Sequence, residues 1–262
     1  MRITPSLTAL LAAFAGPLAA QVINIDFDKD GTSPIYQGLA AAPDPSGSAA
    51  IWNQLYGSGN TTISSSVLTN SSGEVVDGVG FSLEINGSYS SFPGQQENGG
   101  AALTYQDLMS DYVHLSSPTN TQVITKNGSI TGLDPLKLYD IYLYAQGDNF
   151  LGEYSDGQNA LITINGVSKQ TSWDGVLGGN GLLVEGIEYV KFSVLPTASG
   201  SINFSYANVV TGVNAGSDLD GLNSRFAVLN GIQIVDVALV PEPSVALLGA
   251  LGLLVATRRR RR

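Results

Sequence analysis

The chain has 262 residues, is 43% hydrophobic and 13% charged, and contains no cysteine, which excludes disulfide bonds and thiolate metal sites. Residues 21–239 carry 21 acidic but only six basic residues, a net charge of −15. Because a phosphate backbone needs clustered Lys and Arg, we expect no nucleic-acid partner. The composition is typical of a globular protein with one substantial core.

The N-terminus predicts a secretory signal peptide over residues 1–20. Within it, an apolar run at 7–18 follows a single arginine and precedes the small residues Ala19 and Ala20. This order is typical of an exported protein that is cleaved after the small residues. We therefore expect the mature chain to begin at Gln21, with a buried first helix as the alternative.

Most of the segment 21–239 is predicted to form β-strands. The candidate stretches are rich in β-branched and aromatic residues and are bounded by Gly, Asn, Asp and Ser. They cover residues 22–27, 79–85, 121–130, 138–145, 161–164, 189–194, 202–207 and 226–239. Asn-Gly pairs that begin at Asn86, Asn127 and Asn165 are typical of tight hairpin turns.

One stretch, LTYQDLMSDYVHL, has a different pattern. In it Leu108, Met109, Tyr112 and Val113 recur at helical spacing, which predicts a short helix at the edge of the fold. It also contains the single histidine, His114, which we expect at the helix end or on the surface because no motif for a catalytic triad surrounds it. We therefore expect no enzyme of that kind, while hydrolysis by a pair of carboxylates stays open.

Two short motifs favour an all-β fold, a single antiparallel jelly-roll sandwich over residues 21–239. Leu133, Pro135 and Tyr139 have the spacing of a tyrosine corner, in which a phenol bonds the backbone upstream. The stretch AVLNGIQIV, at 227–235, resembles the final strand of galactose-binding-like jelly-roll domains, which include many carbohydrate-binding modules. About ten strands in one segment suit one such sandwich.

Acidic residues at two places suggest a structural calcium ion as a cofactor. Asp26, Asp28 and Asp30 take the spacing of the first EF-hand ligands, although the later positions of that loop carry no acid. Asp218 and Asp220 form a second candidate just before the last strand. Carboxylate oxygens are the ligands that Ca²⁺ prefers, and the sequence leaves the choice between these positions open.

Three aromatic residues in polar stretches are candidates for a carbohydrate site. They are Trp52, Trp173 and Tyr154, each next to amide or carboxylate side chains. A flat ring on a loop suits stacking on a sugar, whereas packing into the core is the alternative use of a large aromatic residue.

The last 23 residues, from Val240, contain three successive parts. Pro241, Glu242 and Pro243 come first, and the prolines favour an extended, accessible backbone. Residues 244–257 then carry no charge; as a helix they would span about 21 Å, which is short of the hydrocarbon core of about 30 Å. The chain ends in five arginines, Arg258, Arg259, Arg260, Arg261 and Arg262. By the positive-inside rule these stay in the cytoplasm and leave the acidic segment outside.

This tail resembles the PEP-CTERM sorting signal of Gram-negative bacteria in the order, spacing and position of its parts. The resemblance implies recognition by an exosortase, a membrane-embedded cysteine transpeptidase that processes the protein near the Pro-Glu-Pro motif. It also implies a transient stay in the inner membrane, and then a place on the cell surface or in a matrix that contains exopolysaccharide. A plain membrane anchor is the alternative.

The sequence therefore predicts an exported surface or matrix protein, with a non-catalytic ectodomain of structural or adhesive role. A carbohydrate-binding module associated with exopolysaccharide is the first alternative, and a glycoside hydrolase or lyase is the second. Exposure of the candidate tryptophans, or two carboxylates that face each other in a groove, would discriminate between these functions.

Overall fold

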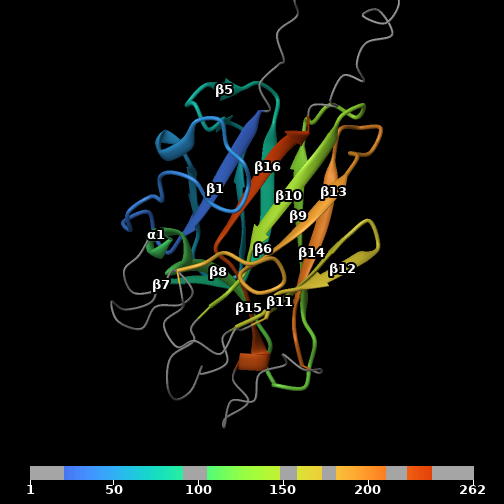
Figure 1. Ribbon diagram of the computed structural model, residues 1–262. Helices are drawn as coiled ribbons and strands as arrows, with labels where there is room; N and C mark the ends of the chain where they lie inside the picture. Colours follow the sequence, from blue (N-terminus) through green and yellow to red (C-terminus); the bar gives the residue numbers. More distant parts are fainter. Residues whose placement is uncertain (1–20, 91–104, 148–157, 173–180, 211–222, 238–262) are drawn as a thin grey trace, which may run out of the picture.

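The computed structural model describes residues 21–90, 105–147, 158–172, 181–210 and 223–237 (Figure 1). The predicted signal peptide at 1–20 and the predicted sorting signal at 240–262 lie outside these ranges. Among the described residues, no helix has the length and apolar character needed to span a bilayer.

The first large sheet has five strands. Their order is β13 (Tyr189–Val194), β10 (Leu138–Tyr144), β16 (Gly231–Val237), β1 (Val22–Asp28) and β2 (Asn53–Tyr56). All neighbours are antiparallel except β1 and β2, which run parallel. This sheet places the first and last described strands side by side at its centre.

The second large sheet has six antiparallel strands. Their order is β12 (Val167–Gln170), β11 (Ala160–Ile164), β14 (Ile202–Asn208), β9 (Thr125–Thr131), β6 (Gly80–Ile85) and β3 (Thr61–Ser65). The sequence of β6 explains why it forms a strand: Phe81, Leu83 and Ile85 are buried while the residues between them are partly exposed. Such a period of two gives a strand with one face in the core.

Smaller elements close the ends of the fold. A three-stranded sheet has the order β15 (Phe226–Leu229), β8 (Asp111–Ser116) and β7 (Gly87–Ser90), and a two-stranded one pairs β4 (Leu68–Thr69) with β5 (Val75–Val76). The described helical parts are short: α1 (Gln106–Met109) and the 3₁₀ turns Gly47–Ala49 and Asn223–Arg225.

The main core lies between the two large sheets. Phe27 of β1 packs against Phe81 of β6 with ring centroids 5.7 Å apart, and Phe81 in turn stacks on Phe204 of β14 at 6.3 Å. Their contact joins the two sheets into one cluster of buried side chains. The predicted all-β sandwich is therefore confirmed.

A second apolar cluster covers the opposite face of the five-stranded sheet. Its described members include Tyr36, Trp52, Leu108 and Tyr144, so the connection between β1 and β2 folds back over the sheet together with α1. Buried Gln233 of β16 accepts a hydrogen bond from the main-chain N–H of Ala42 at 3.0 Å. The side-chain amide of Gln233 also donates to Asn24 Oδ1 of β1 at 2.8 Å. These bonds hold the connection on the sheet, since buried polar groups need partners.

The predicted helix is shorter than its pattern suggested. Only 106–109 is helical, and Tyr112 and Val113 belong to β8, where Val113 faces the core. The alternation of Tyr112 and His114 with Val113 and Leu115 is a strand pattern, and pairing with β7 and β15 selects it over the helix. His114 consequently lies within a strand rather than at a helix end.

Of the three Asn-Gly pairs predicted to form turns, one makes a hairpin. Asn165 and Gly166 form the turn between β11 and β12, with φ values of 50° and 77°. Asn86 instead lies between β6 and β7, where the chain passes to the small sheet, and Asn127 lies inside β9. There a Cβ at Gly128 would lie 2.1 Å from Phe204 Cζ, so glycine makes room for the ring rather than for a turn.

The start of the first strand and the end of the last strand lie side by side. Val22, at the start of β1, pairs with Val235, near the end of β16. In Figure 1 the start of β1 and the end of β16 accordingly lie at the same end of the molecule, at the top of the view, while α1, β7, β8 and β15 lie toward the other end. We call these the proximal and distal ends.

Candidate functional site

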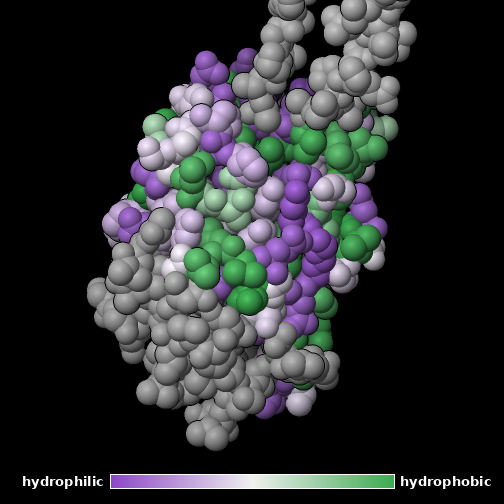
Figure 2. Space-filling view, viewed as in Figure 1, coloured by the Kyte–Doolittle hydropathy of each residue, from purple (hydrophilic) through white to green (hydrophobic). Residues whose placement is uncertain are grey.

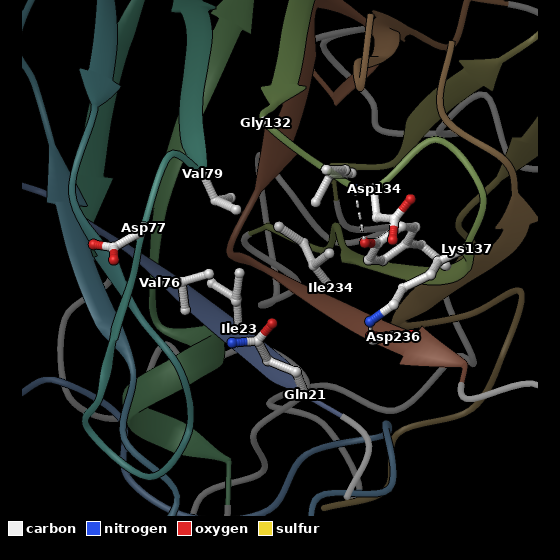
Figure 3. Close-up of a pocket in the computed structure, with 12 residues that line it drawn as sticks. Gln21, Ile23, Val76, Asp77, Val79, Gly132, Asp134, Lys137, Ile234 and Asp236 are labelled. Atoms are coloured by element: carbon white, nitrogen blue, oxygen red, sulfur yellow. Dashed lines mark hydrogen bonds and ion pairs between the residues drawn. The ribbon is translucent and has the colours of Figure 1, made fainter. Parts of the chain in front are cut away.

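A polar pocket opens at the proximal end, between the sheets (Figure 3). This end pocket has a volume of about 180 Å³ and is lined by Gln21, Asp77, Asp134, Lys137 and Asp236 together with apolar core residues. Lys137 Nζ donates to Asp236 Oδ2 at 2.6 Å, and this bond is the main cause that raises the pKa of Lys137. Asp236 Oδ1 is buried and has no hydrogen-bond partner among the described residues.

The predicted tyrosine corner forms the wall of this pocket. The main-chain N–H of Asp134 donates to the phenol oxygen of Tyr139 at 3.2 Å. Tyr139 is buried, and this burial is the main cause that raises the pKa of its hydroxyl. Leu133 also donates its N–H to the carbonyl of Gly200 at 2.9 Å, so the arch joins two connections between the sheets.

Trp52 does not present its ring to solvent, which corrects its assignment as a carbohydrate platform. It is only 3% exposed, and its indole N–H donates to the carbonyl of Gly38 at 3.0 Å. Tyr36 packs edge-on against it, with ring centroids 5.2 Å apart. The polar neighbours in the sequence suggested a loop-borne ring, but the connection that carries Trp52 closes over the sheet and buries it.

Several predicted site residues lie outside the described ranges. These are the aromatic candidates Tyr154 and Trp173, the acidic candidates Asp218 and Asp220, and the sorting-signal residues Pro241, Glu242, Pro243 and Arg258–Arg262.

The EF-hand-like arrangement of Asp26, Asp28 and Asp30 does not form. Asp28 Oδ2 accepts a hydrogen bond from the Gln54 side chain at 2.6 Å, and the main-chain N–H of Thr32 donates to Asp30 Oδ1 at 3.1 Å in an exposed turn. Among the described residues no three His, Asp or Glu side chains are grouped so that they could hold a metal ion. The reason is the strand itself, because β1 buries Asp26 and Asp28 before the loop begins.

A pair of buried carboxyl groups that the sequence did not reveal lies toward the distal end. Asp26 of β1 is 2% exposed; its Oδ2 accepts the N–H of Tyr36 at 2.9 Å, and its Oδ1 has no partner in the described part of the chain. Burial raises the pKa of Asp26 well above its ordinary value, and the charge of Asp111 adds to the shift. Burial also raises the pKa of Asp111, which accepts bonds from the Ser33 and Ser90 hydroxyls.

The small distal sheet carries a row of aromatic rings, also missed from the sequence. Tyr89 of β7 packs against Tyr112 of β8 at 5.8 Å, and His114 packs edge-on between Tyr112 and Phe226 of β15. Gly87, opposite His114, leaves room for the imidazole, since a Cβ there would lie 2.9 Å from Cε1. Burial lowers the pKa of His114, so this histidine is neutral at pH 7.

Comparisons with known proteins give little beyond this geometry. No protein-family model matches the chain, and no curated protein matches it. One similar solved structure is the plant receptor-like kinase ANX2, at 12% identity over 63% of this chain and 51% of that chain, with a TM-score of 0.31. Another is the enzymatically active domain of the bacteriophage CBA120 tailspike protein 4, at 13% identity over 58% of this chain and 17% of that chain, with a TM-score of 0.27. At this level of structural similarity, neither protein indicates a function for this chain.

Proposed function

We propose that this protein is an exported component of the cell surface or extracellular matrix, sorted through its C-terminal tail by an exosortase. The tail carries the proposal: Pro241-Glu242-Pro243, an uncharged run at 244–257 and five terminal arginines follow one another in that order. The β-sandwich is the exported part, with a structural or adhesive role and no catalytic function.

The arrangement of the strands supports attachment at one end. Because β1 and β16 are antiparallel neighbours, the chain enters and leaves the sandwich at the proximal end. The predicted signal peptide and the predicted sorting signal therefore both join the sandwich there, and the distal end points away from the membrane during export.

Apolar side chains at the proximal end are consistent with this orientation. Leu136 and Leu195 are 83% and 56% exposed, in the connections that the tyrosine corner ties together. Figure 2 shows hydrophobic side chains gathered at the upper right, where these connections lie in Figure 1. Exposed apolar surface of this kind suits contact with a lipid surface.

The buried pair of Asp26 and Asp111 does not suit glycoside hydrolysis. Hydrolysis by two carboxylates needs a pair that a sugar chain can reach. Asp26 and Asp111, which influence each other's charge, are instead 2% and 3% exposed. Their burial suits a role in holding the β1–β2 connection against the small sheet.

Carbohydrate binding at the distal end is the second candidate. Tyr89 favours it, because its partly exposed ring packs on the buried Tyr112 and offers a flat apolar face for stacking. Tyr89, 37% exposed, is the most accessible ring of the row. Titration of the protein with bacterial polysaccharides, comparing the native chain with Tyr89→Ala, tests this function: saturable binding weakened by the variant supports it.

The sorting proposal is tested by following the chain in a Gram-negative host with and without its exosortase. We expect Pro241→Ala with Pro243→Ala to leave the full tail attached and the protein in the inner membrane. A matched control is Pro118→Ala, which changes an exposed proline far from the tail in sequence. Equal processing of all three chains, or processing that does not depend on the exosortase, would overturn the proposal.

A further inference from the structure

The end pocket holds more negative than positive charge. Asp77, Asp134 and Asp236 line it, and Lys137 is the single basic side chain among its lining residues. Lys137 is paired with Asp236 Oδ2, which leaves Asp236 Oδ1 without a partner in the described part of the chain although the residue is only 8% exposed. A buried carboxylate oxygen without a donor is costly, so the pocket has room for one further hydrogen-bond donor, and its excess of negative charge favours a cationic one.

Gln21 lies opposite Asp236 on the neighbouring stretch of chain, and both residues line the end pocket. The main-chain N–H of Asp236 donates to the carbonyl of Gln21 at 2.8 Å, in register with the pair of Val22 and Val235. Residues joined in this way form a hydrogen-bonded antiparallel pair, with Cα atoms about 5.5 Å apart and both main-chain N–H groups directed at the partner strand. In such a pair the main-chain nitrogen of Gln21 is directed at the main-chain carbonyl of Asp236, which places it next to the residue that carries the free oxygen.

We propose that the end pocket binds the α-ammonium group of Gln21, which removal of residues 1–20 creates, through the free oxygen of Asp236. The proposal rests on the proposed export of the chain. In the uncut chain the nitrogen of Gln21 is a neutral amide with one hydrogen, whereas after cleavage it carries a positive charge and three donors. Signal-peptide removal thus supplies a cationic donor to the pocket, and stabilises the sandwich after export.

The proposal has a chemical consequence for the glutamine. An N-terminal glutamine cyclises when its amine nitrogen attacks its own side-chain amide carbon, forms a five-membered lactam and expels ammonia. The attack needs the unprotonated amine. An ion pair with Asp236 keeps the group protonated above the ordinary α-amino pKa of about 7.7–8.0, and so slows the cyclisation.

The first test compares two chains in the same mild detergent. One is residues 21–262, released from a fusion partner so that it begins at Gln21; the other carries Gly-Ser in front of Gln21. We expect the chain with the free Gln21 amine to unfold about 2–4 °C higher, the shift that a modest stabilisation gives in a domain of this size. The difference disappears in Asp236→Asn and persists in Asp30→Asn, a control that removes an exposed acid distant from the pocket.

The second test follows the loss of ammonia by mass spectrometry at pH 8. We expect Asp236→Asn to speed cyclisation by about fivefold for a pKa that the ion pair had raised by one unit, since the ordinary amine is about half deprotonated at pH 8. Equal unfolding temperatures for the two chains, together with equal cyclisation rates for native protein and variant, would overturn the proposal. The mass of the exported protein distinguishes a failure of the predicted cleavage from a failure of the pocket's role. A first residue other than Gln21 refutes the predicted cleavage. A chain that begins at Gln21 but shows neither the higher unfolding temperature nor the slower cyclisation refutes only the binding of the amine in the end pocket.

Discussion

The phenol oxygen of Tyr139 accepts a hydrogen bond of 3.2 Å from the main-chain N–H of Asp134, five residues upstream, and so closes the arch between the two sheets at the proximal end. The same arch forms one wall of the end pocket. A single hydroxyl therefore fixes a connection at the same end of the sandwich at which the chain enters β1 and leaves β16.

Removing that hydroxyl is expected to destabilise the sandwich. Tyr139→Phe leaves the buried ring in place but removes the oxygen that accepts the hydrogen bond of the Asp134 N–H. This loss lowers the free energy of unfolding by about 1 kcal/mol. Urea denaturation followed by tryptophan fluorescence measures the change. Tyr56→Phe is the matched control, since Tyr56 is 54% exposed; equal stability of Tyr139→Phe and native protein would show that the arch contributes nothing.

Asp26 is expected to make stability depend on pH. Because burial raises the pKa of Asp26 well above 3.8, the folded state keeps a proton that the unfolded state releases. Its contribution is therefore greatest at acid pH and declines as the pH rises from about 4 through the raised pKa.

The isosteric variant Asp26→Asn removes this dependence. Its amide oxygen can still accept the Tyr36 N–H, and no charge is buried at pH 7, so we expect the free energy of unfolding at pH 7 to rise by about 1–3 kcal/mol. The difference between variant and native protein, measured by urea denaturation from pH 4 to pH 8, grows with pH. Asp30→Asn, in the exposed turn, serves as the control; a difference that stays constant with pH contradicts the account.

Truncation of Trp52 is expected to unfold the β1–β2 connection rather than to remove a sugar platform. The buried indole packs against Tyr36 and bonds to Gly38, so Trp52→Ala costs about 3–5 kcal/mol. Tyr56→Ala, at an exposed aromatic position, costs much less. Protease sensitivity of residues 29–52 and urea denaturation measure both effects; a fully stable Trp52→Ala protein that merely loses glycan binding would reverse the assignment.

Gly128 is expected to tolerate no side chain while Phe204 is present. A methyl group there meets the ring at 2.1 Å, so Gly128→Ala destabilises by about 1–3 kcal/mol through overpacking. The double variant with Phe204→Leu should recover part of the loss, because the smaller side chain yields the space. A double-mutant cycle measures the coupling, and strict additivity would show that the two positions do not touch.

How much the sequence predicts depends on whether the information is local. Strands such as β6 and β10 carry their hydrophobic runs in the chain itself, and the tyrosine corner depends on a fixed spacing, so both were predicted. The pattern of Leu108, Met109, Tyr112 and Val113 predicts one helix, whereas only the first two are helical and the last two belong to β8, whose pairing with β7 and β15 is not visible in the sequence.

The contacts of the candidate site are harder to predict from the sequence, because they too depend on residues that are distant in the chain. Trp52 lies among polar residues, and nothing local reveals that its connection folds back over β1. The charge of Asp111 acts on Asp26 from 85 positions away in the chain, and Asp236 bonds to the main chain of Gln21 across two neighbouring segments. The three-dimensional arrangement creates these pairs, whereas the sorting signal proposed for residues 240–262 rests on a linear motif.

The most direct test of the account is the mass of the intact protein recovered from the cell surface, together with its terminal peptides. We predict a chain that begins at Gln21 and ends near Pro241–Pro243. Peptides from Leu247 to Arg262 on the surface protein would contradict sorting through the tail and leave a plain membrane anchor in its place.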